Sequence, residues 1–445
     1  MELLPFEALY PAETRFDEIE KILGFIKAGN SCQVVGLPGV GRGNLLGFLA
    51  YNHTIKIKHV GEDQHKWLHF VLINFSEVKN KPLFEITKLM FFTLVESLKA
   101  RHMDAAYEKA KERFRESLSY QDELILFQGL KQTIDFMAIE EQLTIVFLFE
   151  RFETYVPMLT ADFFTNLRIL RSRAKYRFSV VLSLNRPLED LIDPAMMADF
   201  YEFLAGHIVY LPITDEPGRE FRIAYLEKAT GKKLDKKLIT EVLSLTAGHL
   251  KLMRICLEIA AEHTDLKVTD FTPAFLLQQK RIKGALLEIW YALSPLEQKC
   301  VMSVNPCDHD QPTYLDQVGL CKNGQITIPL FSEFLKGKKK DMQASADQIL
   351  YHPENKTITK GELVLSEKLT VSEFRLLRYL LENANSILEK EAIIAAVWKD
   401  AKTTAGVSDQ ALDQLIFRLR KKIEDDPNNP THIQTVKGRG VKFIS

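Results

Sequence analysis

The sequence is poor in cysteine and its cysteines form no recognisable pattern. Its 445 residues include five, at Cys32, Cys256, Cys300, Cys307 and Cys321, and none are spaced as Cys-x-x-Cys. Scattered thiols in odd number argue against a disulfide framework or a zinc site, and are typical of reduced, mostly buried cysteines. We therefore expect free thiols and no structural metal.

Long apolar runs and an excess of one charge are also missing. No stretch approaches the roughly 18 uncharged apolar residues of a membrane helix. The start, MELLPFEALYPAETRF, has no basic segment followed by an apolar one, so we expect no signal peptide, no membrane partner and a cytoplasmic location. Because 58 Lys and Arg face 59 Asp and Glu, a nucleic-acid-binding surface must be local.

Residues 1–205 alternate short apolar runs with amphipathic helical segments. The runs are SCQVVGL, WLHFVLINF, LTIVFLFE and RFSVVLSLN. Nearly continuous apolar strands between helices are typical of a parallel sheet covered on both faces. The predicted fold class is therefore α/β in this region.

Three shorter regions follow. Residues 206–283 have helical periodicity throughout and predict a helical lid. In 284–337 a helix leads to the pair Asn323-Gly324 between apolar stretches, a hairpin signal that predicts a small winged-helix module. Residues 338–347 are basic, then small and polar, and predict a linker.

Residues 348–445 predict a separate α+β domain. Paired strands are expected around a turn at 353–355, and Thr370-Val-Ser-Glu373 is a capping box that opens a helix. A second helix is expected over 390–398 and a third over 408–423, with Ser408 as its N-cap.

The third helix is predicted to be amphipathic, with a cationic hairpin after it. Its apolar stripe comprises Ala411, Leu412, Leu415, Ile416, Leu419 and Ile423. Its other face carries Gln410, Gln414, Phe417, Arg418 and Lys421, flanked by Arg420 and Lys422. Two strands then meet at 437–440, where glycines permit a tight turn and Lys437 and Arg439 make the tip cationic.

This combination suits double-stranded DNA. Gln and Arg side chains can bond base edges in the major groove, while Arg and Lys neutralise phosphates. A basic hairpin tip can reach the adjacent minor groove. Cations at a helix end also simply complement the helix dipole, but the two clusters together favour DNA.

The strings LTVSEFRLLRYLLENANSILEKEAIIAAVW, VSDQALDQLIFRLRKKIEDDP and HIQTVKGRGVKF resemble the effector domain of the OmpR/PhoB family of response regulators. The resemblance spans the domain in order. It implies a four-stranded N-terminal sheet, three helices and a hairpin wing. It also implies that 408–423 is the recognition helix and that the loop 399–406 contacts RNA polymerase.

The family's roles carry over by position. The resemblance implies that Arg418 and Gln414 read bases, that Arg420 binds phosphate, that Trp398 and Thr435 contact the DNA backbone, and that Lys437 enters the minor groove. Trp398 is equally expected as a core residue. Gln410 and Phe417 stand where the family often has phosphate-binding Arg, and Phe417 is also suited to a thymine methyl or a protein partner. The family's phosphorylatable receiver domain is missing from this sequence.

A glycine-rich loop lies near the N-terminus, between a predicted strand and a helix. It reads Gly36-Leu-Pro-Gly-Val-Gly-Arg-Gly-Asn44, the context of a P-loop, which cradles phosphates with backbone N–H groups. The candidate nucleotide-binding residues are Gly36, Gly39, Gly41, Arg42, Gly43 and Asn44. Arg42 replaces the usual Lys, and Gly43 replaces the Ser or Thr that holds Mg²⁺, so we do not expect Mg²⁺ to be held in the usual way.

Two strand ends complete the predicted nucleotide site. Glu150 follows LTIVFLF where an acidic Walker B residue usually lies, and Arg186 follows VVLSLN where a γ-phosphate sensor lies. Either residue alone is better explained as an ordinary polar strand end, and only their order along the chain favours a nucleotide site. We predict ATP or ADP as ligand and assign no catalytic or metal-binding residue.

With TRFDEIEKIL, LTAGHLKLMR and GLCKNGQITIPLFSEFL, this order of motifs resembles the STAND branch of AAA+-like signalling NTPases over residues 13–335. The resemblance implies a nucleotide-gated switch that assembles into a homo-oligomer. Hydrolysis, binding without turnover and a purely structural role remain open. The predicted function is a sequence-specific DNA-binding transcription regulator; the alternatives are an ATP-hydrolysing switch and a protein-interaction scaffold in stress or antiphage defence.

Overall fold

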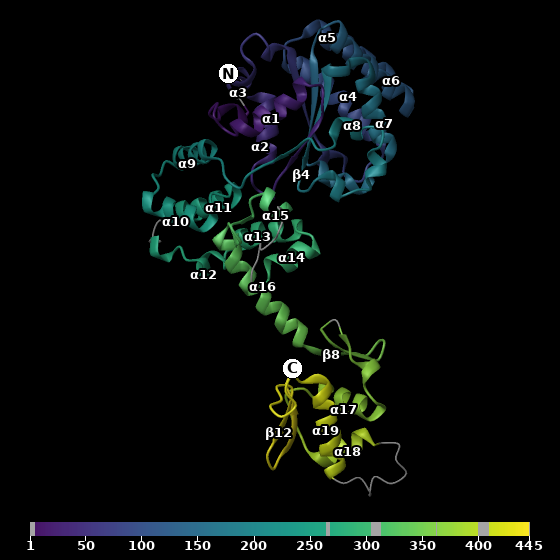
Figure 1. The fold of residues 1–445 in the computed structure, drawn as a ribbon, viewed down its shortest axis with the longest axis vertical. Helices are drawn as coiled ribbons and strands as arrows, with labels where there is room; N and C mark the ends of the chain where they lie inside the picture. Colours follow the sequence, from purple (N-terminus) through teal and green to yellow (C-terminus); the bar gives the residue numbers. More distant parts are fainter. Residues whose placement is uncertain (1–4, 264–267, 304–312, 362, 399–408, 445) are drawn as a thin grey trace. The chain divides into compact units, whose positions relative to one another are not determined.

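The computed structural model describes residues 5–263, 268–303, 313–361, 363–398 and 409–444, with the backbone alone for 340–347. The chain divides into two compact units, Met1–Leu335 and Lys336–Ser445, shown in Figure 1. Each unit has its own hydrophobic core. The finer boundaries expected at 205, 283 and 347 stay predictions.

The first unit is built on a five-stranded parallel sheet with the order β2-β3-β4-β1-β5. Its strands are β1 (Cys32–Val35), β2 (Leu68–Asn74), β3 (Thr144–Glu150), β4 (Phe178–Leu184) and β5 (Ile208–Tyr210). The predicted α/β fold and its four strands are confirmed. The edge strand β5 was not predicted, because three residues give too short a pattern among helical segments.

Helices cover this sheet (Figure 1). They are α1 (Phe16–Lys27), α2 (Arg42–Tyr51), α3 (His53–Val60), α4 (Leu83–Ala100), α5 (Asp104–Ser119), α6 (Glu123–Ile139), α7 (Ala161–Ala174) and α8 (Tyr201–Leu204). All residues of β1 and β4 are buried, which explains their uninterrupted apolar sequences. The chain leaves β1 for β2 at one edge, whereas β5 joins at the other, so the loop after β1 lies at a topological switch point, where ligands of α/β sheets bind.

After β5, the described residues of the first unit form helices and one hairpin, and the last helix continues into the second unit. Its elements are α9 (Glu216–Thr230), α10 (Lys236–Thr246), α11 (Leu250–Glu262), α12 (Pro273–Leu276), α13 (Lys280–Ala292), α14 (Pro295–Val301), α15 (Tyr314–Gln317), β6 (Cys321–Lys322), β7 (Gln325–Ile326) and α16 (Pro329–Asp347). The predicted hairpin is confirmed: β6 and β7 pair antiparallel, and Asn323 and Gly324 have φ of 51° and 74°. Two left-handed residues are what a tight hairpin turn requires.

One expectation for this unit is corrected. Cys321 is disulfide-bonded, whereas Cys32 and Cys256 are free thiols. Spacing along the sequence did not reveal this, because a disulfide depends on Cα atoms meeting in space. The stretch 338–347, which was predicted to be a linker, is helical as the end of α16, since Lys, Met, Gln and Ala favour helix despite their polarity; its role as a linker stays a prediction.

None of the helices that the structure describes is both long enough and apolar enough to cross a lipid bilayer.

The second unit holds two small antiparallel sheets around three helices. Its elements are β8 (Ile349–His352), β9 (Thr357–Lys360), β10 (Leu363–Val364), α17 (Val371–Glu382), β11 (Ile387–Leu388), α18 (Lys390–Val397), α19 (Asp409–Ile423), β12 (Ile433–Val436) and β13 (Gly440–Phe443). The sheet orders are β10-β9-β8 and β11-β13-β12. Within the described residues the N-terminal sheet thus has three strands, one fewer than the family resemblance implied, and β11 was too short to predict.

The core of this unit forms where α17, α18 and α19 meet. It includes Leu376, Leu380, Ile393, Leu415 and Leu419, each essentially inaccessible to solvent. The predicted capping box is confirmed: Thr370 Oγ1 accepts the N–H of Glu373, and Glu373 accepts the N–H of Thr370. Ala411, expected on the apolar stripe of α19, is only half-buried.

Gly440 provides a test of the C-terminal sheet. Its φ is 129°, and a Cβ there would collide with the carbonyl oxygen of Leu388. We expect Gly440→Ala to lower the free energy of unfolding by about 2–4 kcal/mol, seen as faster amide hydrogen exchange in β11 and β13. Gly438→Ala, where φ is 72° and no atom lies within 4 Å of the added carbon, should cost about 1 kcal/mol. Equal effects would contradict this explanation.

Candidate nucleic-acid interface and P-loop region

α19 divides into a buried and an exposed face, as its sequence predicted. Leu412, Leu415, Ile416, Leu419 and Ile423 are buried. The exposed side chains include the predicted Gln410, Gln414, Phe417, Arg418 and Lys421, together with Asp409, Asp413 and Lys422. Phe417 is 41% exposed, and the Nζ of Lys421 lies 4.8 Å from the centre of its ring. This face therefore offers amides, cations, one aromatic ring and the carboxylate of Asp413, which pairs with Lys390 at 2.9 Å. The expected N-cap Ser408 and the loop 399–406 lie outside the described residues.

The hairpin of β12 and β13 presents the second cationic group. Lys437, Gly438 and Arg439 are exposed between the two strands. Gly438 has a φ of 72°, and the N–H of Arg439 donates to the carbonyl of Val436 at 2.9 Å. The predicted cationic tip is therefore a tight turn with both charges in solvent. Thr435, just before it, is also exposed.

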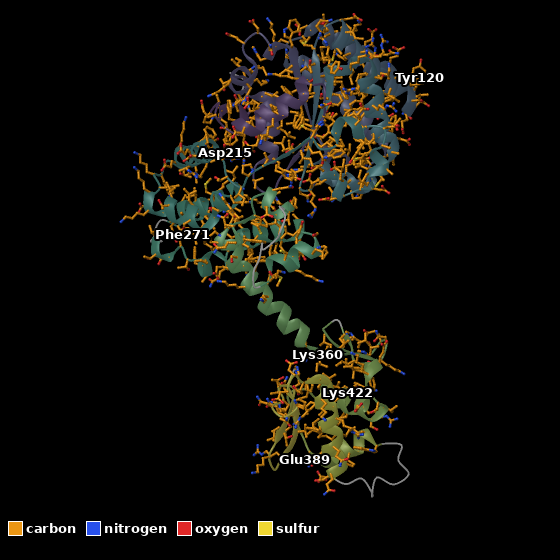
Figure 2. All side chains as sticks on the ribbon, viewed as in Figure 1. Tyr120, Asp215, Phe271, Lys360, Glu389 and Lys422 are labelled. Atoms are coloured by element: carbon orange, nitrogen blue, oxygen red, sulfur yellow. The ribbon has the colours of Figure 1, made fainter. Side chains whose placement is uncertain are left out.

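Two predicted DNA-contacting cations are bonded within the domain. Arg420 donates from Nε and Nη2 to the carbonyl of Ile433, and from Nη2 to Thr435 Oγ1 at 2.8 Å. Lys422, labelled in Figure 2, donates to Glu373 Oε2 at 2.6 Å and to the carbonyl of Lys368 at 2.9 Å. A phosphate would have to compete with these bonds.

Trp398 also has an internal role. Its side chain is half-buried and packs against the core of the C-terminal unit. Its N–H donates to the carbonyl of Ile394 at the end of α18. A backbone contact to DNA from Trp398 stays a prediction, beside a packing role that these contacts support.

Glu424 is a buried carboxylate that the sequence analysis did not single out. It is 8% exposed and accepts the N–H groups of Thr431, His432 and Ile433 at 2.7–3.1 Å. Burial raises the pKa of Glu424, but these donors outweigh burial and the net shift is downward. The only sequence signal was an acid directly after an apolar helix stripe, which does not reveal its partners.

The lowered pKa values predict acid sensitivity of the C-terminal unit. Burial also raises the pKa of Glu373, yet its bonds to Lys422 and Thr370 lower it on balance. Carboxylates with a depressed folded-state pKa stabilise the protein above their unfolded pKa and lose this stabilisation as the pH falls. We expect the melting temperature of this unit to fall steadily between about pH 5 and pH 3.

The matched variants are Glu424→Gln and Asp425→Asn. Glu424→Gln should lower the unfolding free energy by about 1–3 kcal/mol at pH 7 and flatten the acid dependence. Asp425→Asn, at an exposed position next to it, should change little. An acid dependence as steep in Glu424→Gln as in the unmodified protein would refute the assignment.

The P-loop adopts the predicted strand–loop–helix form. It begins after β1 and ends at Gly41, which is the N-cap of α2. Gly39 and Gly41 have φ of 87° and 97°, conformations that favour glycine. Arg42, Gly43 and Asn44 form the first turn of α2, so their N–H groups are of the kind that P-loops direct at phosphate.

The lid helix α11 covers this loop with its first turn. His249 Nε2 donates to the carbonyl of Pro38 at 2.9 Å, and the N–H of Lys251 donates to the carbonyl of Gly39 at 3.1 Å. Burial lowers the pKa of His249 to about 4, so the ring is neutral at pH 7. A Cβ on Gly39 would lie 2.7 Å from both His249 Cε1 and Lys251 Cβ. Lid atoms thus fill the space beside the loop.

Carboxylates occupy the other side of the P-loop. Arg42 Nη2 pairs with Glu153 Oε1 at 2.9 Å, and the two side chains are 12% and 22% exposed. Glu150 Oε1 lies 2.7 Å from where a Cβ on Gly43 would be, so a Ser or Thr there would require the Glu150 carboxylate to move. Burial raises the pKa of Glu150. Lid atoms pack against Gly39 and Arg42 is paired with Glu153, so the loop would have to give up these contacts to hold nucleotide phosphates.

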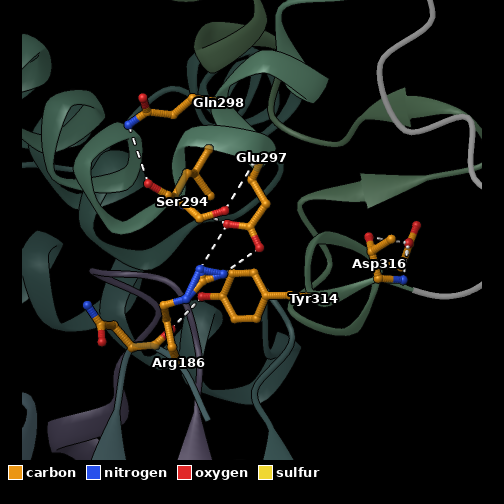
Figure 3. Close-up of polar contacts among 9 residues, drawn as sticks. Arg186, Ser294, Glu297, Gln298, Tyr314 and Asp316 are labelled. Atoms are coloured by element: carbon orange, nitrogen blue, oxygen red, sulfur yellow. Dashed lines mark hydrogen bonds and ion pairs between the residues drawn. The ribbon is translucent and has the colours of Figure 1, made fainter. Parts of the chain in front are cut away.

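Arg186, at the end of β4, is bonded to the winged-helix segment. It forms a bidentate ion pair with Glu297, with Nη1 3.0 Å from Oε2, and its guanidinium lies 4.4 Å from the ring centre of Tyr314. Figure 3 shows this group. Glu297 also closes the capping box of α14 with Ser294. The string Ser-Pro-Leu-Glu could have revealed that cap, but not its arginine partner.

Arg15 is a further residue whose role was missed. It is 3% exposed and donates to the carbonyls of Val40 and Pro212 at 2.8 and 3.0 Å. Its own N–H donates to Asp215, the N-cap of α9. Arg15 therefore ties the segment before α1 to the P-loop and to the base of the lid.

Known proteins match the C-terminal part most clearly. Residues 366–443 match the family described as "Transcriptional regulatory protein, C terminal". The sensory transduction protein RegX3 of Mycolicibacterium smegmatis is 42% identical over 80 residues, which are 17% of this chain and 32% of RegX3. The regulatory protein VirG of Rhizobium rhizogenes is 41% identical over 76 residues, 17% of this chain and 30% of VirG. The chain spans about a third of the length of these relatives.

Two solved structures resemble different parts. The DNA-binding domain of Klebsiella pneumoniae RstA, in complex with the RstA box, is 27% identical, covers 22% of this chain and 90% of its own, and has a TM-score of 0.19. The Aeropyrum pernix ORC2 protein in its ADP form is 13% identical. The match covers 86% of this chain and 96% of ORC2, with a TM-score of 0.38. Residues 366–443 are thus a C-terminal domain of the transcriptional regulatory protein family, of the OmpR/PhoB type, in a chain whose first unit is an α/β P-loop fold.

Proposed function

We propose that this protein is a sequence-specific, double-stranded-DNA-binding transcription regulator. One observation carries the proposal: inside the matched domain, the amides of Gln410 and Gln414, the guanidinium of Arg418 and the cationic hairpin tip are all exposed. RstA, which resembles this domain, is described in complex with its DNA box.

The exposed groups have distinct chemistry toward DNA. Gln414 and Arg418 suit hydrogen bonds to base edges in the major groove. Lys421 and Gln410 suit phosphate oxygens, and Lys437 and Arg439 suit the minor groove, whose negative potential attracts cations. Phe417 suits a thymine methyl. It also provides the one observation that favours the alternative of a protein-interaction scaffold, since an exposed aromatic ring is a common protein contact.

Assembly belongs to the same proposal. A single small DNA-binding module buries limited surface, so two copies on neighbouring half-sites supply affinity by avidity. We therefore propose a homo-oligomer on repeated sites. A contact between the loop 399–406 and RNA polymerase is proposed from the family resemblance alone.

The first unit is proposed to control this activity. ATP or ADP can bind only if the lid contacts of His249 and Lys251 leave the P-loop. Hydrolysis is not supported, because Arg42 is paired with Glu153 and no hydroxyl at Gly43 can hold Mg²⁺. An ATP-hydrolysing switch is therefore the weaker alternative.

Selection of bound sequences from a random duplex library tests DNA binding by the full chain. We expect Arg418→Ala to weaken binding to the selected site by about 1–3 kcal/mol and to relax preference at one base pair. Lys421→Ala should weaken binding to all duplexes equally. It should also reduce the slope of log affinity against log salt concentration by about 1.

The control is Lys356→Gln, at an exposed lysine between β8 and β9, far in sequence from α19 and the tip. It should leave affinity and selectivity unchanged. The regulator proposal is rejected if the unmodified protein enriches no duplex and instead binds a protein partner through Phe417. That result would favour the interaction scaffold.

The nucleotide hypothesis has its own test. We expect Glu150→Gln combined with His249→Ala to strengthen ADP binding at least about tenfold, since a repelling charge and a lid contact are removed. Calorimetry of ADP binding measures this, and Glu140→Gln is the control at an exposed acid. Phosphate release from Mg²⁺-ATP should stay at the buffer rate in the unmodified protein; a robust rate lost in Arg42→Ala would contradict us.

A further inference from the structure

Arg420 and Glu424 hold an edge strand of the C-terminal sheet from the end of α19. Arg420 lies in the last turn of α19, Glu424 directly follows the helix, and β12 is an edge strand in the order β11-β13-β12. The N–H of Ile433 donates to Glu424 Oε1 at 2.7 Å, and its carbonyl accepts from Arg420 Nε and Nη2 at 3.0 and 2.7 Å. Both backbone polar groups of Ile433 are therefore satisfied by side chains at the C-terminal end of α19.

The same guanidinium also reaches Thr435, two residues further along β12. Arg420 Nη2 donates to Thr435 Oγ1 at 2.8 Å. Two of the three guanidinium nitrogens are thus engaged with β12, and the side chain is only half-exposed. Arg418 and Lys421, its neighbours on α19, are exposed instead. Arg420 therefore differs from the cations that face solvent.

These bonds connect the two parts of the proposed DNA interface. β12 leads directly into the tip that carries Lys437 and Arg439, and α19 carries Gln414 and Arg418. A planar guanidinium that holds one carbonyl with two donors fixes direction as well as distance, which a lysine cannot do. The strand, and with it the tip, is held in one position relative to the helix.

We infer that Arg420 is a positioning residue that sets the hairpin tip relative to the recognition face of α19, and not a phosphate contact. The inference rests on the proposed DNA-binding function. Helix and tip can engage adjacent grooves together only if their separation is fixed before binding, because ordering a loose hairpin would subtract from affinity.

The test compares two backgrounds in the full chain, using a duplex selected as above. One background is the unmodified protein; the other is Lys437→Ala/Arg439→Ala, in which the tip has no cations. We expect Arg420→Ala to weaken binding about tenfold in the first background and less than twofold in the second. Arg420→Lys, which keeps the charge, should behave like Arg420→Ala.

A phosphate contact would give a different pattern. Arg420→Ala would then weaken DNA binding equally in both backgrounds. In the background without tip cations it would also lower the slope of log affinity against log salt concentration by about 0.9. Arg420→Lys would retain most of the affinity. Either result overturns the inference. Lys421→Ala serves as the matched comparison, since its charge is exposed one position along α19.

A measurement without DNA separates this inference from the proposed function. Amide hydrogen exchange at Thr435 and Val436 should be at least about tenfold faster in Arg420→Ala than in Lys421→Ala. Unchanged exchange would show that Arg420 does not hold β12 in position, even if the protein binds DNA. Failure of the unmodified protein to select any duplex would instead overturn the proposed function, while the exchange result would still decide whether Arg420 holds the strand.

Discussion

Burial of the apolar stripe of α19 is the constraint on which the proposed interface depends. Each buried leucine or isoleucine contributes about 1.5–3 kcal/mol relative to exposure, and Leu412, Leu415, Leu419 and Ile423 all face the core. Rotating the helix would expose them, so packing alone fixes Gln414 and Arg418 in solvent. The core thus sets the orientation of α19. The hydrogen bonds of Arg420 and Glu424 then fix the position of β12 relative to this helix.

Arginine side chains also connect separate segments of the first unit. Arg15, Arg42 and Arg186 each bridge segments far apart in the sequence, through carbonyls or carboxylates. Two of them, Arg42 and Arg186, lie where a nucleotide enzyme would direct cations at phosphate. Here their charges are neutralised by Glu153 and Glu297. These ion pairs therefore join the P-loop to the segment after β3, and the segment after β4 to α14.

Local patterns made much of this structure predictable, and long-range pairing did not. The strands β1 to β4, the turn at Asn323-Gly324 and the cap at Thr370 follow from residues close together in sequence. The partners of Arg420 and Arg186 lie 13 and 111 positions away, and no periodicity encodes such distances. The same holds for Cys321 and for β5, whose edge position depends on the assembled sheet. Arg420 was placed on the right helix, but its contacts emerged only in three dimensions.

The crowding at Gly39 and Gly43 has a consequence for how glycine-rich loops are interpreted. At Gly39 the lid residues His249 and Lys251 leave no room for a methyl group, and at Gly43 a methyl group would displace the Glu150 carboxylate. Packing against the lid therefore requires glycine at position 39 whether or not the loop binds a nucleotide. A glycine in such a loop can be explained by its protein neighbours alone.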